Sequence, residues 1–228
     1  MSLDDLQAVW LTLKLAGLVT LILMGLALPL AWWLAQNQTR WRAPVEALVT
    51  LPLVLPPTVL GFYLLMVLSP QSSVGQGLHA LGLPQLAFSF EGLVLGSLCY
   101  SLPFAVQPLK AGFAQLGREP LEAAQLLGAN RWQQFFRIVL PATRPALLTA
   151  ATMSFAHTLG EFGVVLMLGG SIPGETQVVS IALFQHVEAS RYAQAHQLAV
   201  LMLGLSFFLL LLVYGLGAQR RPATAPRD

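Results

Sequence analysis

The residues best able to do chemistry form a short polar stripe late in the sequence. His157 and Glu161 are the one ionisable pair that could act as an acid and a base, and Ser154 and Thr158 add hydroxyl groups. These four positions are spaced i, i+3, i+4 and i+7, which predicts one face of a helix. No nucleophile motif, metal cluster or phosphate loop accompanies them, so a membrane enzyme is a weak alternative.

The rest of the chain offers little for metal, redox or nucleotide chemistry. Cys99 is the single cysteine, and His157 has no nearby histidine or cysteine with which to bind a metal. No Gly-x-x-x-x-Gly-Lys-Ser/Thr sequence is present to bind ATP. We therefore expect no catalytic residue, no metal site, no cofactor and no nucleic-acid partner, and any energy source must be another polypeptide.

The composition predicts that the stripe lies inside a membrane. Hydrophobic residues make up 56% of the 228 residues and charged residues 10%, whereas soluble domains have about 25% charged residues. A helix needs about 20 apolar residues to cross a bilayer core. Such stretches occur at about 11–35, 45–68, 92–109, 146–168 and 198–216. We expect an all-α bundle of about five transmembrane helices, with residues 1–228 as one membrane domain.

Two interpretations of the stripe remain open. Ionisable groups at membrane depth usually face a bundle interior or an aqueous path. Ala146, Ala150, Ser154 and Thr158 also repeat every four residues, which permits close contact between helices. The stripe could therefore line a path or form a polar interface. We expect Glu161 to lie near the outer interface or to pair with another group.

Lysine and arginine predict the orientation, because loops rich in them stay in the cytoplasm. Ten of the 12 fall in 36–44, in 110–145 and in the tail from 217, where they include Arg220, Arg221 and Arg227. Only Lys14 and Arg191 belong to the other side. We expect the N-terminus and the 169–197 loop outside, and the 110–145 loop and C-terminus in the cytoplasm. Within the outer loop, 176–189 is too short to span and predicts an interfacial or re-entrant helix.

Proline interrupts several crossings. Each proline inside a helix removes one backbone hydrogen bond, and in a membrane the freed carbonyl must be met by a neighbouring helix or a water-filled cavity. We expect helix breaks at Pro52, Pro56 and Pro57, and kinks or interruptions at Pro29, Pro103 and Pro108. Such features are commoner in transporters than in plain anchors, although proline is also ordinary in transmembrane helices.

The 110–145 loop contains a pattern that predicts a short helix, a sharp turn and a second helix. Pro120 suits the first helical position, which makes Glu122 the third residue, near the positive end of the helix dipole. Gly128 can adopt the left-handed conformation that ends a helix, and Asn130 can cap the next one. A helix of about eight residues is marginal alone in water, so it must be held by the rest of the chain or by a partner.

This spacing of Glu-Ala-Ala, glycine and Ile-x-Leu-Pro resembles the coupling motif of permeases in binding-protein-dependent ABC importers. The matching residues are Glu122, Ala123, Ala124, Gly128, Ile138, Leu140 and Pro141. The resemblance implies the type I importer permease fold in the bacterial inner membrane, with the chain paired with a second copy of itself. It also implies two cytoplasmic ATPase subunits, which bind ATP and Mg and receive the short helix in a cleft, and an external oxyanion-binding protein.

Two further segments resemble the molybdate permease branch of that family. They are 51–61 and 159–163, the latter continuing to 172–176. Sulfate and thiosulfate permeases are similar around Glu161-Phe162-Gly163, and nothing in the chain separates molybdate from tungstate. No basic residue lies mid-membrane, which fits a permease that leaves selectivity to an external protein, because tight binding would slow passage.

A stand-alone secondary transporter is the other alternative. Such proteins often contain a repeated half, and the sequence shows no internal repeat. Five crossings are also few to enclose a path, which pairing two copies would remedy.

Overall fold

The computed structural model describes residues 1–82 and 84–218, and for 212–218 the backbone alone. The regular structure of these residues is helical, which confirms the all-α prediction. The elements are α1 (Leu3–Gln36), α2 (Arg42–Val54), α3 (Pro57–Leu68), α4 (Ser73–Ala80), α5 (Phe90–Gln115), α6 (Glu119–Leu126), α7 (Arg131–Gln134), the π-helical η1 (Phe135–Val139), α8 (Leu140–Ala142), α9 (Arg144–Leu159), α10 (Gly163–Gly169), α11 (Val179–Glu188) and α12 (Tyr192–Ala218).

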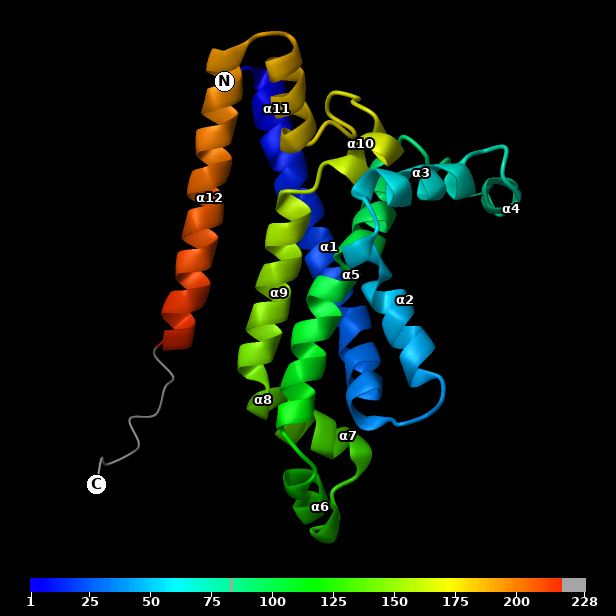
Figure 1. The fold of residues 1–228 in the computed structure, drawn as a ribbon, viewed down its shortest axis with the longest axis vertical. Coiled ribbons are helices and arrows are strands. Elements are labelled where there is room, and N and C mark those ends of the chain that lie inside the picture. The colour runs from blue at the N-terminus through cyan, green and yellow to red at the C-terminus, as the bar shows by residue number, and fades with distance from the viewer. Residues whose placement is uncertain (83, 219–228) are drawn as a thin grey trace.

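The longest helix, α1, is central to the bundle. It begins with a capping box, in which the Ser2 hydroxyl accepts the Asp5 N–H and the Asp5 carboxylate accepts the Ser2 N–H. Buried apolar side chains recur along one face from Leu11 to Leu34. This face packs against α5 and α9. The three helices form the core around which the others are arranged (Figure 1).

Three helices of the described chain, α1, α5 and α12, are each long and apolar enough to cross a membrane. Two more crossings exist only as bent pairs. The chain bends by 113° between α2 and α3 and by 58° between α9 and α10. When each bent pair counts as one span, the total is five, and the spans coincide with the five predicted stretches. The sequence pattern did not reveal that α3 turns sharply away from the direction of α2 (Figure 1).

The break between α2 and α3 lies at Leu55 and Pro56. A proline disfavours helical geometry in the residue before it, and consecutive prolines leave Leu55 and Pro56 extended, with ψ of 136° and 135°. Pro57 then begins α3. The prediction of a break at Pro52 is wrong, because this proline lies buried inside α2. A single proline removes one hydrogen bond, and here the helix continues for two more residues.

The other predicted prolines also lie inside helices. Pro29 is within α1, and Pro103 and Pro108 are within α5, neither of which is interrupted. These helices keep their neighbours on several sides, because α1 contacts α5 and α9 while α5 also contacts α2 and α10. Helix packing of this kind holds a span together where one backbone bond is missing.

The bundle has two distinct ends (Figure 1). One carries α6, α7 and α8, which lie within the 110–145 loop. The other carries the N-terminus, α4, α10 and α11. The predicted short helix within 176–189 is α11, and it docks on α1 through specific bonds. Thr12 accepts the Val179 N–H at 2.8 Å, and the Asp5 carboxylate lies 2.7 Å from the His186 Nε2.

Arg220, Arg221 and Arg227, which carry part of the orientation prediction, lie outside the described residues.

Candidate functional site

Helix α6 carries the Glu-Ala-Ala segment at one end of the molecule. It begins at Glu119, so Glu122 is its fourth residue, one later than predicted. Both carboxylates lie in the first turn, where the helix dipole favours negative charge. Leu121 and Ala124 are buried against the chain, whereas Ala123 is exposed. The helix is therefore anchored by one face and presents the other to the surroundings.

The turn after α6 has the predicted geometry. Gly128 has a φ of +81°, and the N–H groups of Ala129 and Gly128 donate to the carbonyls of Ala124 and Gln125. These two bonds form a Schellman motif. A Cβ at Gly128 would meet nothing within 4 Å, so the need for glycine here comes from the backbone conformation alone.

The next helix begins with the predicted cap. The Asn130 side chain accepts the Gln133 N–H at 2.8 Å, and the Gln133 side chain accepts the Asn130 N–H at 2.9 Å. This capping box starts α7. Both the left-handed turn and the cap were predictable because each depends on residues that are adjacent in the chain.

A group of exposed apolar side chains surrounds this turn, and we call it the coupling surface. Leu126 and Leu127 are 90% and 88% exposed, and Trp132 and Phe136 are 73% and 56% exposed. The Trp132 and Phe136 rings stack with centroids 5.9 Å apart. Exposed apolar patches of this kind mark surfaces that bind other proteins or contact the membrane. Sequence reasoning missed these four residues, although two leucines directly before a turn glycine are unusual for a polar loop.

The remaining motif residues connect the turn to the bundle. Ile138 lies in η1, and Leu140 and Pro141 begin α8. Their neighbour Val139 is fully buried, and its carbonyl accepts the Thr143 hydroxyl at 2.7 Å. Helical turns thus follow one another almost without interruption from α7 to α9. A displacement of α6 and α7 would be passed directly to a long helix of the core.

The polar stripe is only partly as predicted. Ser154, His157 and Thr158 lie on α9, but Glu161 does not, because α9 ends at Leu159 and α10 begins at Gly163. The prediction of one helical face with four members is therefore wrong for Glu161. Gly160 caps α9 and Gly163 opens α10, and glycine weakens a helix by the backbone entropy it loses. These two residues bracket the bend in which Glu161 lies.

A small hydrogen-bonded cluster joins α9 to α5. The Ser101 hydroxyl lies 2.8 Å from the His157 Nδ1 and 3.0 Å from the Thr158 hydroxyl. The His157 ring stacks on Phe104 at 3.8 Å between centroids. Ser154 and Thr158 are buried. These contacts favour the interface alternative for Thr158, whereas the buried Ser154 hydroxyl has no hydrogen-bond partner among the described residues. They also add Ser101, a residue 56 positions from His157 that no local pattern could have identified.

Glu161 occupies an unusual position inside the bend. It is 3% exposed, and neither carboxylate oxygen has a hydrogen-bond partner among the described residues. Its backbone carbonyl accepts the Ser180 hydroxyl at 2.6 Å. Glu161 lies toward the end that carries α10 and α11. The predicted partner group for its carboxylate is not found within the described chain.

Close glycine contacts join the two bent crossings. A Cβ added to Gly163 would lie 2.8 Å from the Pro57 Cβ and 3.3 Å from the Thr58 nitrogen. A Cβ added to Gly61 would lie 2.8 Å from the Met167 Cβ. Real Cβ atoms do not approach so closely, so both glycines are needed for α3 and α10 to touch. The break at Pro56 and the break at Glu161 therefore belong to one packed unit.

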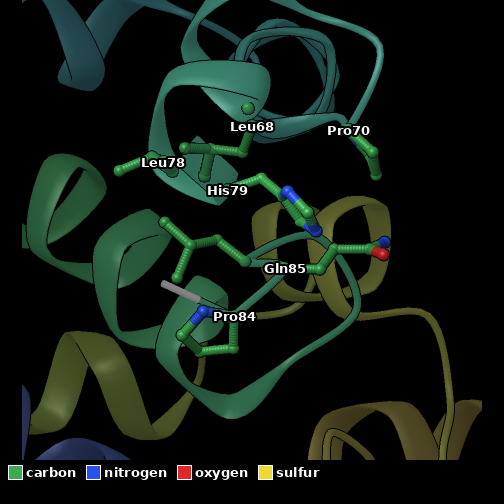
Figure 2. Close-up of a pocket in the computed structure, with 8 residues that line it drawn as sticks. Leu68, Pro70, Leu78, His79, Pro84 and Gln85 are labelled. Carbon is green, nitrogen blue, oxygen red and sulfur yellow. The ribbon is translucent and has the colours of Figure 1, made fainter. Parts of the chain in front are cut away.

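A small cavity beside α4 is a poor candidate for a ligand site. Figure 2 shows Leu78, His79, Pro84 and Gln85 around it, and its volume is about 60 Å³. Ligand pockets usually have roughly 300–1,000 Å³. In residues 1–82 and 84–218, no three His, Cys, Asp or Glu side chains gather where they could hold a metal ion.

The hydrogen-bonded cluster between α5 and α9 predicts the effect of replacing Thr158. We expect Thr158→Val to remove one buried bond and to lower stability by about 1 kcal/mol, or about 2–4 °C in Tm for a domain of this size. In the importer that the sequence resemblance implies, uptake should stay close to that of the wild type. Thermal unfolding of the purified protein measures the first quantity and uptake by intact cells the second.

Thr152→Val is the matched control, because that hydroxyl bonds only to the Leu148 carbonyl of its own helix. In addition, Thr158→Cys should resist a polar thiol reagent whether or not ATP is trapped on the transporter. Labelling in either state, or slowed uptake at full stability, would contradict the interface interpretation in favour of a path.

Comparison with known proteins places these features in a family context. Residues 27–220 match the family described as binding-protein-dependent transport system inner membrane component. The chain is 52% identical over 214 residues to the molybdenum transport system permease protein of Azotobacter vinelandii, covering 94% of this chain and 95% of that one. It is 34% identical over 197 residues to a sulfate transport system permease protein of Escherichia coli, covering 86% and 71%.

A solved structure agrees with the fold. A bacterial ABC transporter involved in the import of the acidic polysaccharide alginate contains a chain that superposes with a TM-score of 0.81 at 21% identity. The match covers 96% of this chain and 81% of that chain.

Proposed function

The chain belongs to the family of binding-protein-dependent transport system inner membrane components, and we propose that it is the permease of an ATP-driven molybdate importer. The assignment of molybdate as the substrate rests on the 52% identity to a molybdenum permease, compared with 34% identity to a sulfate permease. In this family the membrane subunit is not an enzyme and binds no cofactor, because ATP is bound by the separate ATPase. Family membership also rules out the membrane-enzyme and secondary-transporter alternatives.

The exposed side of α6 and the coupling surface are suited to binding the ATPase. The docking face comprises Glu122, Ala123 and the apolar side chains of Leu126 and Leu127, while Ala124 anchors the helix from behind. When the two ATPase subunits close on ATP, each would pull on the α6 end of one copy of the chain. The pull would then pass through Ile138, Leu140 and Pro141 into α9, and on to the bend at Glu161.

We propose that two copies of the chain enclose the path and that each copy forms one domain. A single copy has three continuous crossings and two bent ones, and in the described residues α12 packs mainly against α9 and α11. The second copy would complete the enclosure. An external binding protein would deliver the anion at the end that carries α11. This agrees with the absence of a mid-membrane lysine or arginine that would hold the anion tightly.

The orientation follows from the basic residues of the described chain. Arg40, Arg42, Lys110 and all arginines from Arg118 to Arg144 belong to the end that carries α6. We propose that this end is cytoplasmic and that α11 lies outside, with the N-terminus outside and the C-terminus inside.

Single cysteines test this orientation in a Cys99→Ala background. Gln115 and Glu175 are both exposed and lie at opposite ends. An impermeant thiol reagent should label Glu175→Cys in cells whose inner membrane is intact, and should label Gln115→Cys only after that membrane is opened. Equal labelling in opened membranes is the control. The reverse pattern would invert the proposed topology.

Uptake experiments test the substrate. In cells that lack their own molybdate permease, this chain with its ATPase and binding protein should restore accumulation of labelled molybdate. Unlabelled tungstate should compete strongly, because it is nearly isosteric, and sulfate at the same concentration should compete weakly. Strong competition by sulfate, with little by tungstate, would move the chain to the sulfate branch.

A further inference from the structure

Two adjoining cavities lie between α1 and α7 at the end that carries α6. One has a volume of about 510 Å³ and the other about 590 Å³, both within the size range of ligand pockets. Trp32 and Arg131 line both cavities. Because they share these two residues, the cavities lie side by side, and we call the pair the α1–α7 groove. It is distinct from the Ser101 cluster and from the bend at Glu161.

The groove changes from apolar to polar along its length. Its apolar part is lined by Gly25, Leu28 and Pro29 of α1, and by Trp132, Phe135 and Phe136. Its polar part begins at Trp32 and continues past Gln36 and Asn37, where α1 ends. From Gly25 to Trp32 the helix rises about 10 Å. The apolar part thus points toward the membrane centre and the polar part toward the membrane surface, the same order as in a phospholipid.

The charge of the polar part fits an anion. Arg118 and Arg131 line it together with a single carboxylate, Glu122. The ion pairs of the described residues involve Arg42, Lys110 and His186, so both groove arginines keep their donors available. Guanidinium groups bind phosphate through paired hydrogen bonds. Anionic lipids are concentrated in the cytoplasmic leaflet, and basic pockets between helices on that side bind their headgroups.

We propose that the α1–α7 groove binds an anionic phospholipid of the cytoplasmic leaflet. An acyl chain fills the apolar part, and the phosphate lies between Arg118 and Arg131. The proposal depends on the proposed function only for its cytoplasmic orientation. Gly25 lies 11 residues before the end of α1, or about 16 Å along the axis, so the end of the apolar part at Gly25 lies at a depth that a soluble ATPase does not reach.

The site has a consequence for coupling. Trp132 and Phe136 belong both to the coupling surface and to the wall of the groove. A bound lipid would join α1 to α7 and hold these rings beside the ATPase. Transport activity should therefore depend on the supply of anionic lipid.

The charge is tested with the complete transporter, including its ATPase. The purified complex is exchanged into mixed phosphatidylglycerol and phosphatidylcholine, and lipid retained after detergent washing is counted by native mass spectrometry. Arg118→Gln with Arg131→Gln should lower retained phosphatidylglycerol by about thirtyfold, since each basic residue near the surface contributes to anionic-lipid binding. Arg137→Gln with Arg144→Gln removes the same charge outside the groove and should leave retention unchanged.

The apolar part is tested by filling it. Both Gly25 and Gly17 lie on α1, and a Cβ on either would meet nothing within 4 Å, but only Gly25 lines the groove. Gly25→Leu should therefore reduce retained lipid of both kinds, while Gly17→Leu should not. Because both glycines are exposed and a Cβ at either position meets nothing within 4 Å, both variants should fold.

The same preparations separate the possible outcomes. The proposal is overturned if the wild type retains phosphatidylglycerol no better than phosphatidylcholine. It is also overturned if Gly25→Leu releases the ATPase without changing lipid retention, which would assign the groove to a protein partner. In either case, wild-type molybdate uptake and ATPase co-purification would leave the proposed function standing. A wild type that neither binds the ATPase nor transports molybdate would instead refute that function.

Discussion

Replacing Ala123 with tryptophan is expected to abolish ATP-driven uptake while leaving membrane insertion intact. Ala123 is exposed on the docking face of α6, so a large ring would be accommodated in the isolated chain but would collide with a bound ATPase. Changes at the centre of an interface commonly cost about 2 kcal/mol or more, which is roughly a thirtyfold loss of affinity. The measurements are co-purification of the ATPase and cellular uptake of molybdate.

Gly128→Val should have a similar effect for a different reason. The φ of +81° is strained for any side chain and most of all for a β-branched one, at a cost of about 1–3 kcal/mol. The Schellman turn would open, and α6 would lose its orientation relative to α7.

Controls for both changes come from the opposite end of the molecule. Gly82 also has a positive φ, of +73°, and open space around its Cβ position, so Gly82→Val introduces the same strain far from α6. Ala80 is an exposed alanine at the end of α4, which makes Ala80→Trp the counterpart of Ala123→Trp. Full ATPase association in either α6 variant, or equal loss in its control, would contradict the coupling assignment.

The second large effect is expected where the bent crossings touch. Gly163→Ala adds a single methyl group that would lie 2.8 Å from the Pro57 Cβ and 3.3 Å from the Thr58 nitrogen. Overpacking of this kind costs typically about 1–3 kcal/mol, so we expect α10 to separate from α3 and uptake to fall by about tenfold. ATPase co-purification should be unchanged, because α6 lies at the other end.

Gly160→Ala is the internal control for this change. A Cβ at Gly160 would lie 3.8 Å from the nearest atom, the Ala156 carbonyl oxygen, which is ordinary contact. It lies in the same bend and receives the same methyl group, so its uptake should match the wild type. If both alanine variants transport equally well, the contact between α3 and α10 is not needed for function.

The features that sequence predicted best are those that depend on neighbours in the chain. The turn at Gly128 and the cap at Asn130 follow from backbone chemistry over a few residues, and the five apolar stretches follow from the thickness of a bilayer. The break at Pro56 was similarly local, because Pro56 and Pro57 act directly on Leu55.

The features that were missed depend on residues distant in sequence. Glu161 was assigned to α9 by spacing alone, but α9 stops at Leu159 because α10 must reach α3. Ser101 belongs to the cluster only because α5 packs on α9. Hydrophobicity marked Leu126 and Leu127 as apolar, but only their 90% and 88% exposure distinguishes a docking surface from a core.

The bonds between α1 and α11 set an order for biogenesis. The Asp5–His186 contact spans 181 residues and the Thr12–Val179 contact spans 167. At a synthesis rate of roughly 5–20 residues per second, the first helix waits on the order of 10–40 s for its last partners. During that interval α1 can pack against α5 and α9, which are synthesised earlier, but its N-terminal end lacks α11. A ribosome stalled before codon 179 would therefore leave α1 held in the bundle with its N-terminal end undocked until synthesis resumes.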